Sequence, residues 1–346
     1  MEFLIDIVLL AFLVAVALAI VSMKDLFSVI MLSGIYGLLS ASFFVAMDAV
    51  DVAFTEAAVG AGISTLLMLV AITMTGRSED PDRHKPFLAL AVVVVTGGLL
   101  IYGTFDMPAF GSAQAPIHQQ VVPRYIQHSM EEIGVPNIVT SVLASYRGFD
   151  TFGEVVVIFT AGMGVLALLS VARRPEDIAE IDSLNDSMHE QHLILRIVSK
   201  MLLPFILLFA LYVQFHGDYG PGGGFQAGVI FAAAIILYAM LFGMSTARRV
   251  INQSFIQLLA AAGVLLYGSV GIVSLLEGKN FLDYGVLSDD PVAGQHLGIL
   301  LIELGVGITV ASVMVIIFFN FAGRRENAHS GEENEMQNNN RGNNKT

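Results

Sequence analysis

Nine long apolar stretches run through this sequence, and most are long enough to form a helix that crosses a lipid bilayer. A membrane-spanning helix needs about 20 apolar residues. The stretches lie at 3–22, 26–47, 53–74, 86–105, 152–172, 202–216, 226–245, 255–276 and 297–321. Only 14% of the residues are charged, compared with about 25% in a typical soluble domain. The sequence therefore predicts an all-α, polytopic integral membrane protein with about nine transmembrane helices.

Basic residues in the connections between these stretches predict the orientation of the chain. Cytoplasmic loops of membrane proteins carry an excess of Lys and Arg. Alternate connections contain Lys24, Arg77, Arg83, Lys85, Arg173, Arg174, Arg248 and Arg249, and the C-terminal end adds Arg324 and Arg325. The opposite connections hold few basic residues in much longer segments. We therefore expect the N-terminus outside the cell membrane and the C-terminus inside. Residues 1–21 lack a basic leader and a cleavage site, so we interpret them as the first span.

Two polar connections divide the chain into modules. The first is Gly76–Lys85 and the second is the acidic stretch Arg173–Gln191. They predict a three-span module at 1–80, a module at 81–185 with two spans and a long external segment, and a four-span module at 186–322. The external segment, Asp106–Arg147, contains a predicted surface helix at 123–133 followed by a turn at 134–136. The tail at 323–346 has almost no apolar residues, which predicts disorder.

Composition excludes several classes of function. The chain contains no Cys, so it has no disulfide, no thiol nucleophile and no thiolate ligand for an iron–sulfur cluster. Its net charge is −13 and no polybasic surface is evident, which argues against nucleic-acid binding. No nucleophile–base arrangement and no cluster of metal ligands stands out. We expect neither enzymatic activity nor a cofactor or bound metal.

Acidic residues within or at the ends of the predicted spans are the first candidates for function. A charge in the hydrocarbon core costs about 2.5–3.5 kcal/mol, and such residues often mark ion or proton paths. Asp51 and Glu56 lie near the start of the third span, within the string MDAVDVAFTEAAVGAGIST. Asp48 and Asp51 can alternatively be interfacial caps. Glu56 lies deeper, which favours a polar interior.

A second acidic pair, Asp150 and Glu154, lies at the start of the fifth span. The residues are one helical turn apart on one face, and Arg147 precedes them by one turn. They form either a hydrated ion relay or, for Asp150, an N-cap at the positive end of the helix dipole. In the last span, Glu303 lies about two turns into an apolar helix with His296 on the same face. A buried, functional or partner-facing carboxylate is the favoured interpretation of Glu303.

A glycine-rich break separates the sixth and seventh spans. The string FHGDYGPGGGFQAG places Pro221, Gly222, Gly223, Gly224 and Phe225 in sequence, and regular helix cannot pass through such a run. It lacks the Lys-Ser/Thr ending of a phosphate-binding loop. His216, just before the break, is a candidate proton shuttle because its ordinary pKa is near 6.5. A structural turn with one interfacial histidine is the favoured interpretation.

Three parts of the sequence resemble three small membrane proteins joined end to end. DAVDVAFTEAAVGAG resembles the D subunit of energy-converting membrane-bound hydrogenases, a module also found near the C-terminus of the Mrp antiporter A subunit. VPNIVTSVL and YRGFDTFGE resemble the corresponding E subunit. LPFILLFALYVQFHGDYGPGGGFQAGVI and HLGILLIELGVGITVA resemble the B subunit of Mrp-type (Mnh) antiporters.

The resemblance implies a membrane subunit of a multisubunit monovalent cation/proton antiporter that exchanges Na⁺ for H⁺. It implies partners similar to the A, C, D, E, F and G subunits, with a truncated form of A. Asp51, Glu56, Asp150, Glu154, Glu303 and His216 are then candidates for the ion pathway. The alternatives are a membrane subunit of an energy-converting hydrogenase or a related redox complex, and a purely structural assembly scaffold. A stand-alone transporter is disfavoured because no internal repeat is visible.

Overall fold

The structure, a computed structural model, describes residues 2–79, 86–109, 111–169 and 193–343. Within these ranges the protein is all-α, and nine helices are long and apolar enough to cross a membrane. The elements are α1 (Glu2–Ser22), α2 (Leu26–Ala46), α3 (Val50–Glu56), η1 (Ala57–Ile63), α4 (Ser64–Thr75), α5 (Pro86–Thr104), α6 (Pro116–Glu132), α7 (Ile138–Thr140), η3 (Ser141–Tyr146), α8 (Gly148–Leu169), α10 (Leu193–His216), α11 (Gly224–Phe242), α12 (Met244–Val250), α13 (Gln253–Leu276), η5 (Tyr284–Leu287) and α14 (Pro291–Asn343).

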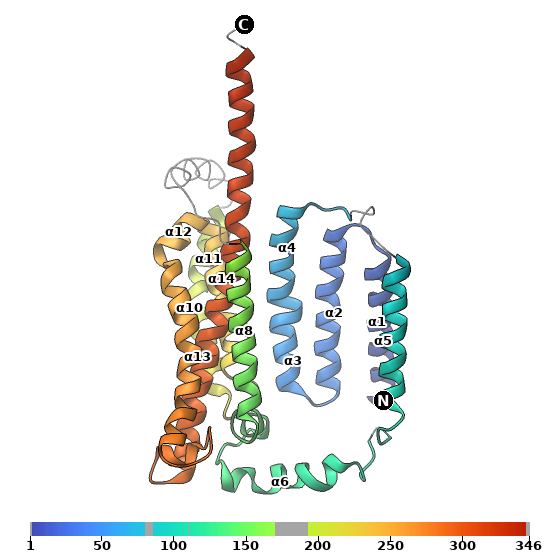
Figure 1. The fold of residues 1–346 in the computed structure, drawn as a ribbon, viewed down its shortest axis with the longest axis vertical. Coiled ribbons are helices and arrows are strands. Elements are labelled where there is room, and N and C mark those ends of the chain that lie inside the picture. The colour runs from blue at the N-terminus through green and yellow to red at the C-terminus, as the bar shows by residue number, and fades with distance from the viewer. Residues whose placement is uncertain (1, 80–85, 110, 170–192, 344–346) are drawn as a thin grey trace.

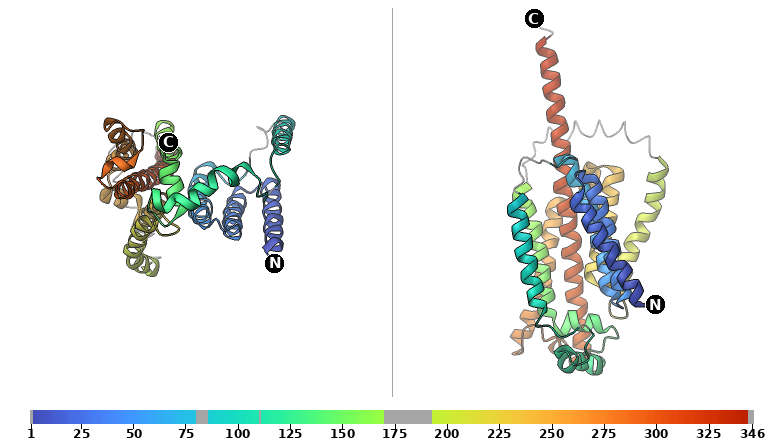
Figure 2. Two further views of the ribbon diagram at one scale, coloured as in Figure 1. Left: turned by 90° about the horizontal axis from the view of Figure 1, so that it is seen from below. Right: turned by 90° about the vertical axis from the view of Figure 1, so that its right-hand side faces the viewer.

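The spans form two groups (Figure 1). The continuous rod α3–η1–α4 packs on α2, and α2 packs on α1. In the second group α14 packs against α8, α11 and α13, and α10 packs on α11. α4 and η1 join the groups through contacts with α14 and α11. Helix α5 lies at the edge, away from the second group (Figure 2).

Small residues allow the helices around α14 to approach closely. A Cβ atom added to Gly228 of α11 would lie 2.7 Å from the carbonyl oxygen of Gly307 on α14. A Cβ atom added to Gly305 of α14 would lie 2.7 Å from the carbonyl oxygen of Gly263 on α13. Glycine at such contacts is typical of helix pairs in membranes, where close van der Waals contact replaces the hydrophobic effect. α14 is consequently the central helix of the second group.

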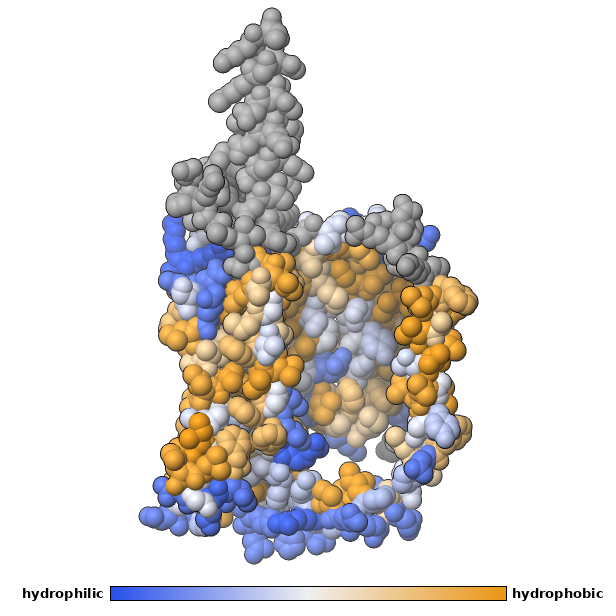
Figure 3. Space-filling view, viewed as in Figure 1, coloured by the Kyte–Doolittle hydropathy of each residue, from blue (hydrophilic) through white to orange (hydrophobic). Residues whose placement is uncertain are grey.

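The distribution of hydrophobic and hydrophilic residues over the surface is typical of a membrane protein. The sides of the bundle are mainly hydrophobic, and hydrophilic residues gather at the end that carries α6 (Figure 3). We call this the α6 end. Helix α6 lies across it, roughly perpendicular to the spans, and the N-terminus lies near the same end. The C-terminus projects from the opposite end, as an odd number of spans requires.

The observed helices differ from the predicted ones at several boundaries. α3 begins at Val50, α8 at Gly148 and α10 at Leu193, each earlier than expected. α10 extends back through Arg196 and Lys200 because both cations lie over the ring of Phe242, at 5.2 and 5.3 Å from its centroid. The surface helix α6 starts at Pro116 rather than at residue 123.

The tail also differs from its prediction. α14 continues as helix to Asn343, beyond the bundle (Figure 1), where the low apolar content of 323–346 predicts disorder. Extension of an existing helix avoids the cost of nucleation, and the Arg, Glu, Gln, Met and Ala residues here have good helix propensity. The second predicted connection, Arg173–Gln191, and residues 80–85 of the first lie outside the described residues.

Candidate functional site

The glycine-rich break folds back beneath the end of α10. α10 ends at His216 and α11 begins at Gly224, so the break predicted from Pro221–Gly224 is present. The backbone N–H of Gly223 donates to the carbonyl of Val213 at 3.0 Å. Gly223 has φ of 111°, a conformation that side chains with a Cβ rarely adopt. A Cβ atom at Gly222 would lie 2.7 Å from the carbonyl oxygen of Val213. Glycine is therefore required at both positions.

The carboxylate of Glu303 lies directly against this break. A Cβ atom added to Gly223 would be 3.1 Å from Oε1 of Glu303, and one added to Gly217 would be 3.3 Å from Oε2. The backbone carbonyl of Glu303 contacts Gly224, the first residue of α11. Glu303 is thus held on α14 at the point where α14 crosses the start of α11.

Two further carboxylates approach Glu303 from other elements. Asp51, in the first turn of α3, lies within hydrogen-bonding reach of the Asn137 side chain and the backbone of Gly222. Asp218 lies in the break itself. Both are close enough to Glu303 to interact with it electrostatically. We call Asp51, Asp218 and Glu303 the acid cluster.

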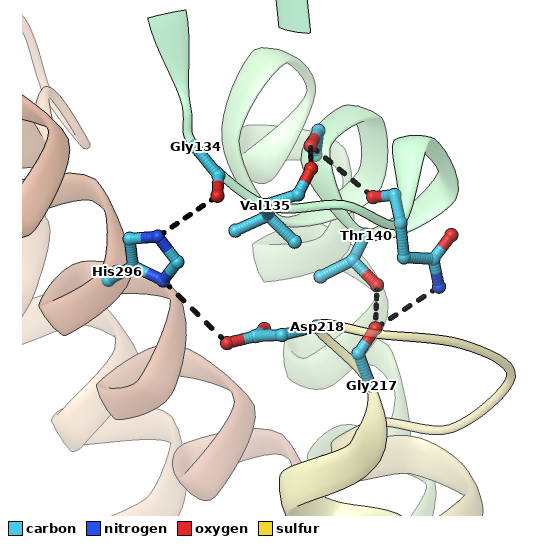
Figure 4. A network of polar contacts seen from close by, with 8 residues as sticks. Gly134, Val135, Thr140, Gly217, Asp218 and His296 are labelled. Carbon is cyan, nitrogen blue, oxygen red and sulfur yellow. Dashed lines mark hydrogen bonds and ion pairs between the residues drawn. The ribbon is translucent and has the colours of Figure 1, made fainter. Parts of the chain in front are cut away.

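A polar network anchors the break to the segment between α6 and α7 (Figure 4). His296 of α14 lies between Asp218 and this segment: its Nδ1 is 3.8 Å from Oδ2 of Asp218, and its Nε2 is 3.2 Å from the carbonyl oxygen of Gly134. Thr140 donates its hydroxyl to the carbonyl of Gly217 at 2.6 Å, and the Asn137 side chain donates to the same carbonyl at 3.1 Å.

Burial and charge act in opposite directions on Asp218. Burial raises the pKa of the Asp218 carboxyl above its ordinary value, and the neighbouring His296 opposes part of that rise. A buried carboxylate without a full set of partners favours its protonated form. The carboxyl of Asp218 therefore holds its proton to a higher pH than an exposed aspartate does.

Thr55 and Glu56 lie next to the acid cluster but face different partners. The Thr55 hydroxyl accepts a hydrogen bond from Nε2 of Gln226 on α11 at 2.8 Å. Glu56 turns toward α2, where a Cβ atom on Gly37 would be 3.3 Å from its Oε1. The helix changes to π geometry immediately after Glu56, and such segments are frequent at functional sites.

Asp150 and Glu154 lie on α8, on exposed surface. Nε of Arg147 donates to Asp150 at 2.7 Å, as the one-turn spacing predicts, and α8 begins two residues before Asp150. Tyr267 of α13 donates its hydroxyl to the carbonyl of Gly148 at 2.6 Å. The Tyr267 hydroxyl is close enough to Glu154 and Glu303 to interact with both electrostatically. Tyr267 thus ties the start of α8 to α13.

His216 ends α10 and faces other partners than His296 does. Its ring stacks on Tyr212 with 4.9 Å between centroids, and it packs against Gly220. The histidine in contact with the acid cluster is His296, seven residues before Glu303. Phe225 packs partly buried against the hydrophobic core.

Three members of this site do not emerge from the sequence alone. Asp218 belongs to the FHGDYGPGGGFQAG string, where the glycines predict a turn, and an acid beside a helix break is itself a signal of function. Asn137 caps α7, where its side chain accepts from the N–H of Val139 at 3.0 Å; Thr140 follows it by three residues. Only the fold shows that these two contact the break.

Within residues 2–79, 86–109, 111–169 and 193–343, no three His, Cys, Asp or Glu residues are arranged to hold a metal ion.

Comparison with known proteins identifies three consecutive segments. Residues 11–77 match the MbhD family, the D subunit of MBH, and residues 84–185 match the MbhE family, the E subunit of MBH. Residues 194–316 match the "Domain related to MnhB subunit of Na+/H+ antiporter".

Individual relatives agree with these matches. The putative antiporter protein mnhB2 of Staphylococcus aureus (strain Newman) is 34% identical over 141 residues, which cover 40% of this chain and 99% of that protein. The probable K⁺/H⁺ antiporter A/B subunit of Rhizobium meliloti (strain 1021) is 25% identical over 325 residues, or 85% of this chain. The match covers only 32% of the Rhizobium protein, so the chain spans about a third of that relative.

Two solved structures share the fold. The Mrp complex from Dietzia sp. DQ12-45-1b contains a chain that matches 91% of this chain and 34% of its own length, with a TM-score of 0.72 and 23% identity. The membrane-bound sulfane sulfur reductase, an archaeal respiratory membrane complex, contains a chain matched over 97% of its length and 68% of this one, with a TM-score of 0.50 and 30% identity. The chain is a multi-pass membrane protein that belongs to the MnhB family of Na⁺/H⁺ antiporter subunits, with MbhD and MbhE domains ahead of its MnhB domain.

Proposed function

We propose that this protein is a membrane subunit of a multisubunit monovalent cation/proton antiporter and that its acid cluster forms part of the proton path. The observation that carries the proposal is the convergence of Asp51, Asp218 and Glu303 at the glycine break. They come from α3, the α10–α11 connection and α14. Acids from three distant parts of the chain meet where Glu303 lies on the apolar span α14, and ionisable residues within membrane spans often mark ion or proton paths.

The geometry suggests an order of proton transfer. Asp218 and His296 lie at the α6 end, next to the polar segment that carries Gly134. Glu303 lies deeper, on the apolar part of α14, and Tyr267 lies within electrostatic range of it. A proton that enters at the α6 end meets Asp218 first and Glu303 next.

The names of the relatives support exchange of Na⁺ or K⁺ for H⁺. The family description names a Na⁺/H⁺ antiporter, and the Rhizobium relative is named for K⁺/H⁺. The length of the Rhizobium relative indicates that further polypeptide completes the transporter. We therefore propose that the chain acts together with partners similar to the A, C, D, E, F and G subunits, rather than alone or as an enzyme.

Deletion and complementation test this proposal. Everted vesicles from antiporter-deficient bacteria that express the complete gene set should show Na⁺- or K⁺-dependent proton release, followed with acridine orange. Omission of this chain should abolish the signal, and its return on a second plasmid should restore it. Purified chain alone should give no exchange in proteoliposomes. Full exchange without the chain would refute the proposal.

A redox complex is the second candidate because the sulfane sulfur reductase chain is matched over 97% of its length at 30% identity. Affinity purification of the tagged chain from its native membrane separates the two functions. Co-purification of large antiporter-like membrane subunits, without iron-containing peripheral subunits, supports the antiporter. Stoichiometric iron in the purified complex supports the redox assembly.

A further inference from the structure

Two buried tyrosines hold the start of α8. Tyr267 lies on α13 and Tyr284 begins η5, and both side chains are fully buried. The Tyr267 hydroxyl donates to the carbonyl of Gly148 at 2.6 Å, and the Tyr284 hydroxyl donates to the carbonyl of Ala144 at 2.8 Å. Both tyrosines lie in the segment that matches MnhB, whereas both carbonyls lie in the segment that matches MbhE. We call Tyr267 and Tyr284 the tyrosine pair.

The backbone at the junction of η3 and α8 explains why these carbonyls need donors from elsewhere. η3 has π geometry, and α8 begins two residues after η3 ends. The N–H of Arg147 donates to the carbonyl of Val142 at 2.8 Å, and the N–H of Asp150 donates to the carbonyl of Arg147 at 2.9 Å. Neither bond has the spacing of an α-helix. Buried carbonyls beside such an interruption require other donors, and the tyrosine pair supplies two.

Gly148 leaves room for both hydroxyls. A Cβ atom added to Gly148 would lie 2.8 Å from the hydroxyl oxygen of Tyr284 and 3.6 Å from that of Tyr267. The φ of Gly148 lies outside the left-handed region, so the backbone conformation alone does not require glycine. The close approach of the tyrosine pair does require it.

The start of α8 positions the acids that follow it. The ring of Phe152 packs on Tyr267 with 5.2 Å between centroids, so the first turns of α8 stay against α13. Glu154 comes six residues after Gly148, about 9 Å further along the helix. The Tyr267 hydroxyl is close enough to Glu154 and Glu303 to interact with both electrostatically. A displacement of α8 at Gly148 therefore moves Glu154 relative to Glu303.

We infer that Tyr267 and Tyr284 are positioning residues for exchange. Their hydroxyls fix the start of α8 against α13 and η5, and so place Glu154 relative to Glu303. Neither hydroxyl transfers a proton itself, since each donates to a backbone carbonyl. The inference rests on the proposed antiport, and it adds the contact through which the MbhE and MnhB segments hold their acids in one arrangement.

Spin labels on the full chain test the positioning without transport. The chain contains no Cys, so introduced cysteines carry the only labels. Val157→Cys on α8 and Leu276→Cys on α13 place labels at exposed residues. The distance between the labels is measured by double electron–electron resonance on the purified chain in lipid nanodiscs. We expect Tyr267→Phe, Tyr284→Phe and Gly148→Ala each to shift or broaden the distance distribution, because each removes or displaces a hydroxyl at the start of α8.

Matched controls change the same residue types elsewhere. The ring of Tyr238 packs on Phe242 within α11, and a Cβ atom on Gly164 of α8 would meet no atom within 4 Å. Tyr238→Phe and Gly164→Ala should leave the distance distribution unchanged. Circular dichroism and elution as a single peak identify variants that fold. An unchanged distribution in both Tyr284→Phe and Gly148→Ala would overturn the inference.

Exchange by the complete complex tests what the positioning does. Rates in everted vesicles are divided by the amount of assembled complex. Tyr267→Phe should lower this normalised rate about fivefold, because a buried carbonyl at the start of α8 then loses its donor. In the Glu154→Gln background the same change should lower the rate by less than about twofold, because it acts through Glu154. A tyrosine needed only for folding would lower the amount of complex and leave the normalised rate unchanged.

The two measurements separate this inference from the proposed function. Absence of cation-dependent exchange in the wild-type complex would refute the antiport proposal, and the label distances would still decide whether the tyrosine pair fixes α8. Where the wild-type complex exchanges, equal fold losses from Tyr267→Phe with Glu154 and with Glu154→Gln would overturn the positioning of Glu154 by the tyrosine pair.

Discussion

The Glu303 carboxylate rests against Gly223, where an added Cβ atom would come within 3.1 Å of Oε1. The contact joins the acid of the last span to the one residue of the break that has a left-handed φ, 111°. The break therefore reverses the chain and also places Asp218 and the backbone of its glycine residues next to the carboxylate of Glu303, inside the membrane region.

Replacement of Gly223 should therefore be costly. Gly223→Ala places a Cβ at φ of 111° and ψ of −179°, a backbone region adopted almost only by glycine, at a cost of about 1–3 kcal/mol, and also places it against Glu303. Gly76→Ala is the matched control because Gly76 has a similar backbone conformation, φ of 93° and ψ of 166°, and no atom within 4 Å of an added Cβ. We expect thermal unfolding of the detergent-solubilised complex to occur at a lower temperature for Gly223→Ala than for Gly76→Ala. Equal shifts would show that φ alone matters and that the contact with Glu303 does not.

The pKa of Asp218 predicts a pH dependence of stability. Burial raises its pKa in the folded protein above the ordinary value of 3.8, so the folded state binds the proton more tightly than the unfolded state. Stability linked to this group is full below pH 3.8 and decreases as the pH rises through the folded pKa. Asp218→Asn removes this dependence. Wild type should therefore gain stability relative to Asp218→Asn as the pH is lowered from about 7 to about 5, measured by thermal unfolding, and a change of opposite sign would contradict the assignment.

The two acids of α8 should contribute unequally to transport. Asp150 is paired with Arg147, whereas no cation pairs with Glu154 among the described residues of α8. Glu154→Gln should impair exchange more than Asp150→Asn, and the double change should be less than additive because the two residues are one turn apart. Vesicle exchange rates normalised to complex yield provide the measurement. Helix caps without a role in transport would give the reverse result, a lower yield with Asp150→Asn and a normal rate with Glu154→Gln.

The orientation of the chain in the membrane is a prediction from the basic loops. The structure places the α6 segment and the C-terminus at opposite ends, and the excess of Lys and Arg predicts that the C-terminal end is cytoplasmic. Alkaline phosphatase and green fluorescent protein are each fused after residue 346 and within 111–115. The fusions after residue 346 should report the cytoplasm, and those within 111–115 should report the exterior. The inverse pattern would reverse the direction of the proposed proton path.

Much of the fold follows from sequence because hydropathy is a local property. Each of the nine predicted spans overlaps a helix that is long and apolar enough to cross a membrane, and the glycine run before Phe225 predicts the break between α10 and α11. The start of α10 does not follow in the same way. Arg196 and Lys200 lower the local hydropathy, while a contact with the distant Phe242 accommodates them.

The site is less predictable because its members meet only through tertiary contacts. The position of Glu303 inside an apolar stretch identifies it as unusual, but nothing local connects it with Asp218 or Asp51. The choice between His216 and His296 also depends on which ring faces the break. His216 stacks on Tyr212, whereas His296 reaches Asp218 and Gly134.

The exchange activity of Glu303→Gln tests the central claim most directly. The change is nearly isosteric, and Glu277→Gln serves as a control because Glu277 is an exposed acid at the end of α13. Without the carboxylate, a proton must pass this depth as an uncompensated charge at about 2.5–3.5 kcal/mol, and each step of about 1.36 kcal/mol is tenfold in rate. In everted vesicles with equal amounts of assembled complex, we predict that Na⁺- or K⁺-dependent proton exchange falls at least about tenfold in Glu303→Gln and is unchanged in Glu277→Gln. Wild-type exchange in Glu303→Gln would contradict a role for the acid cluster in the proton path.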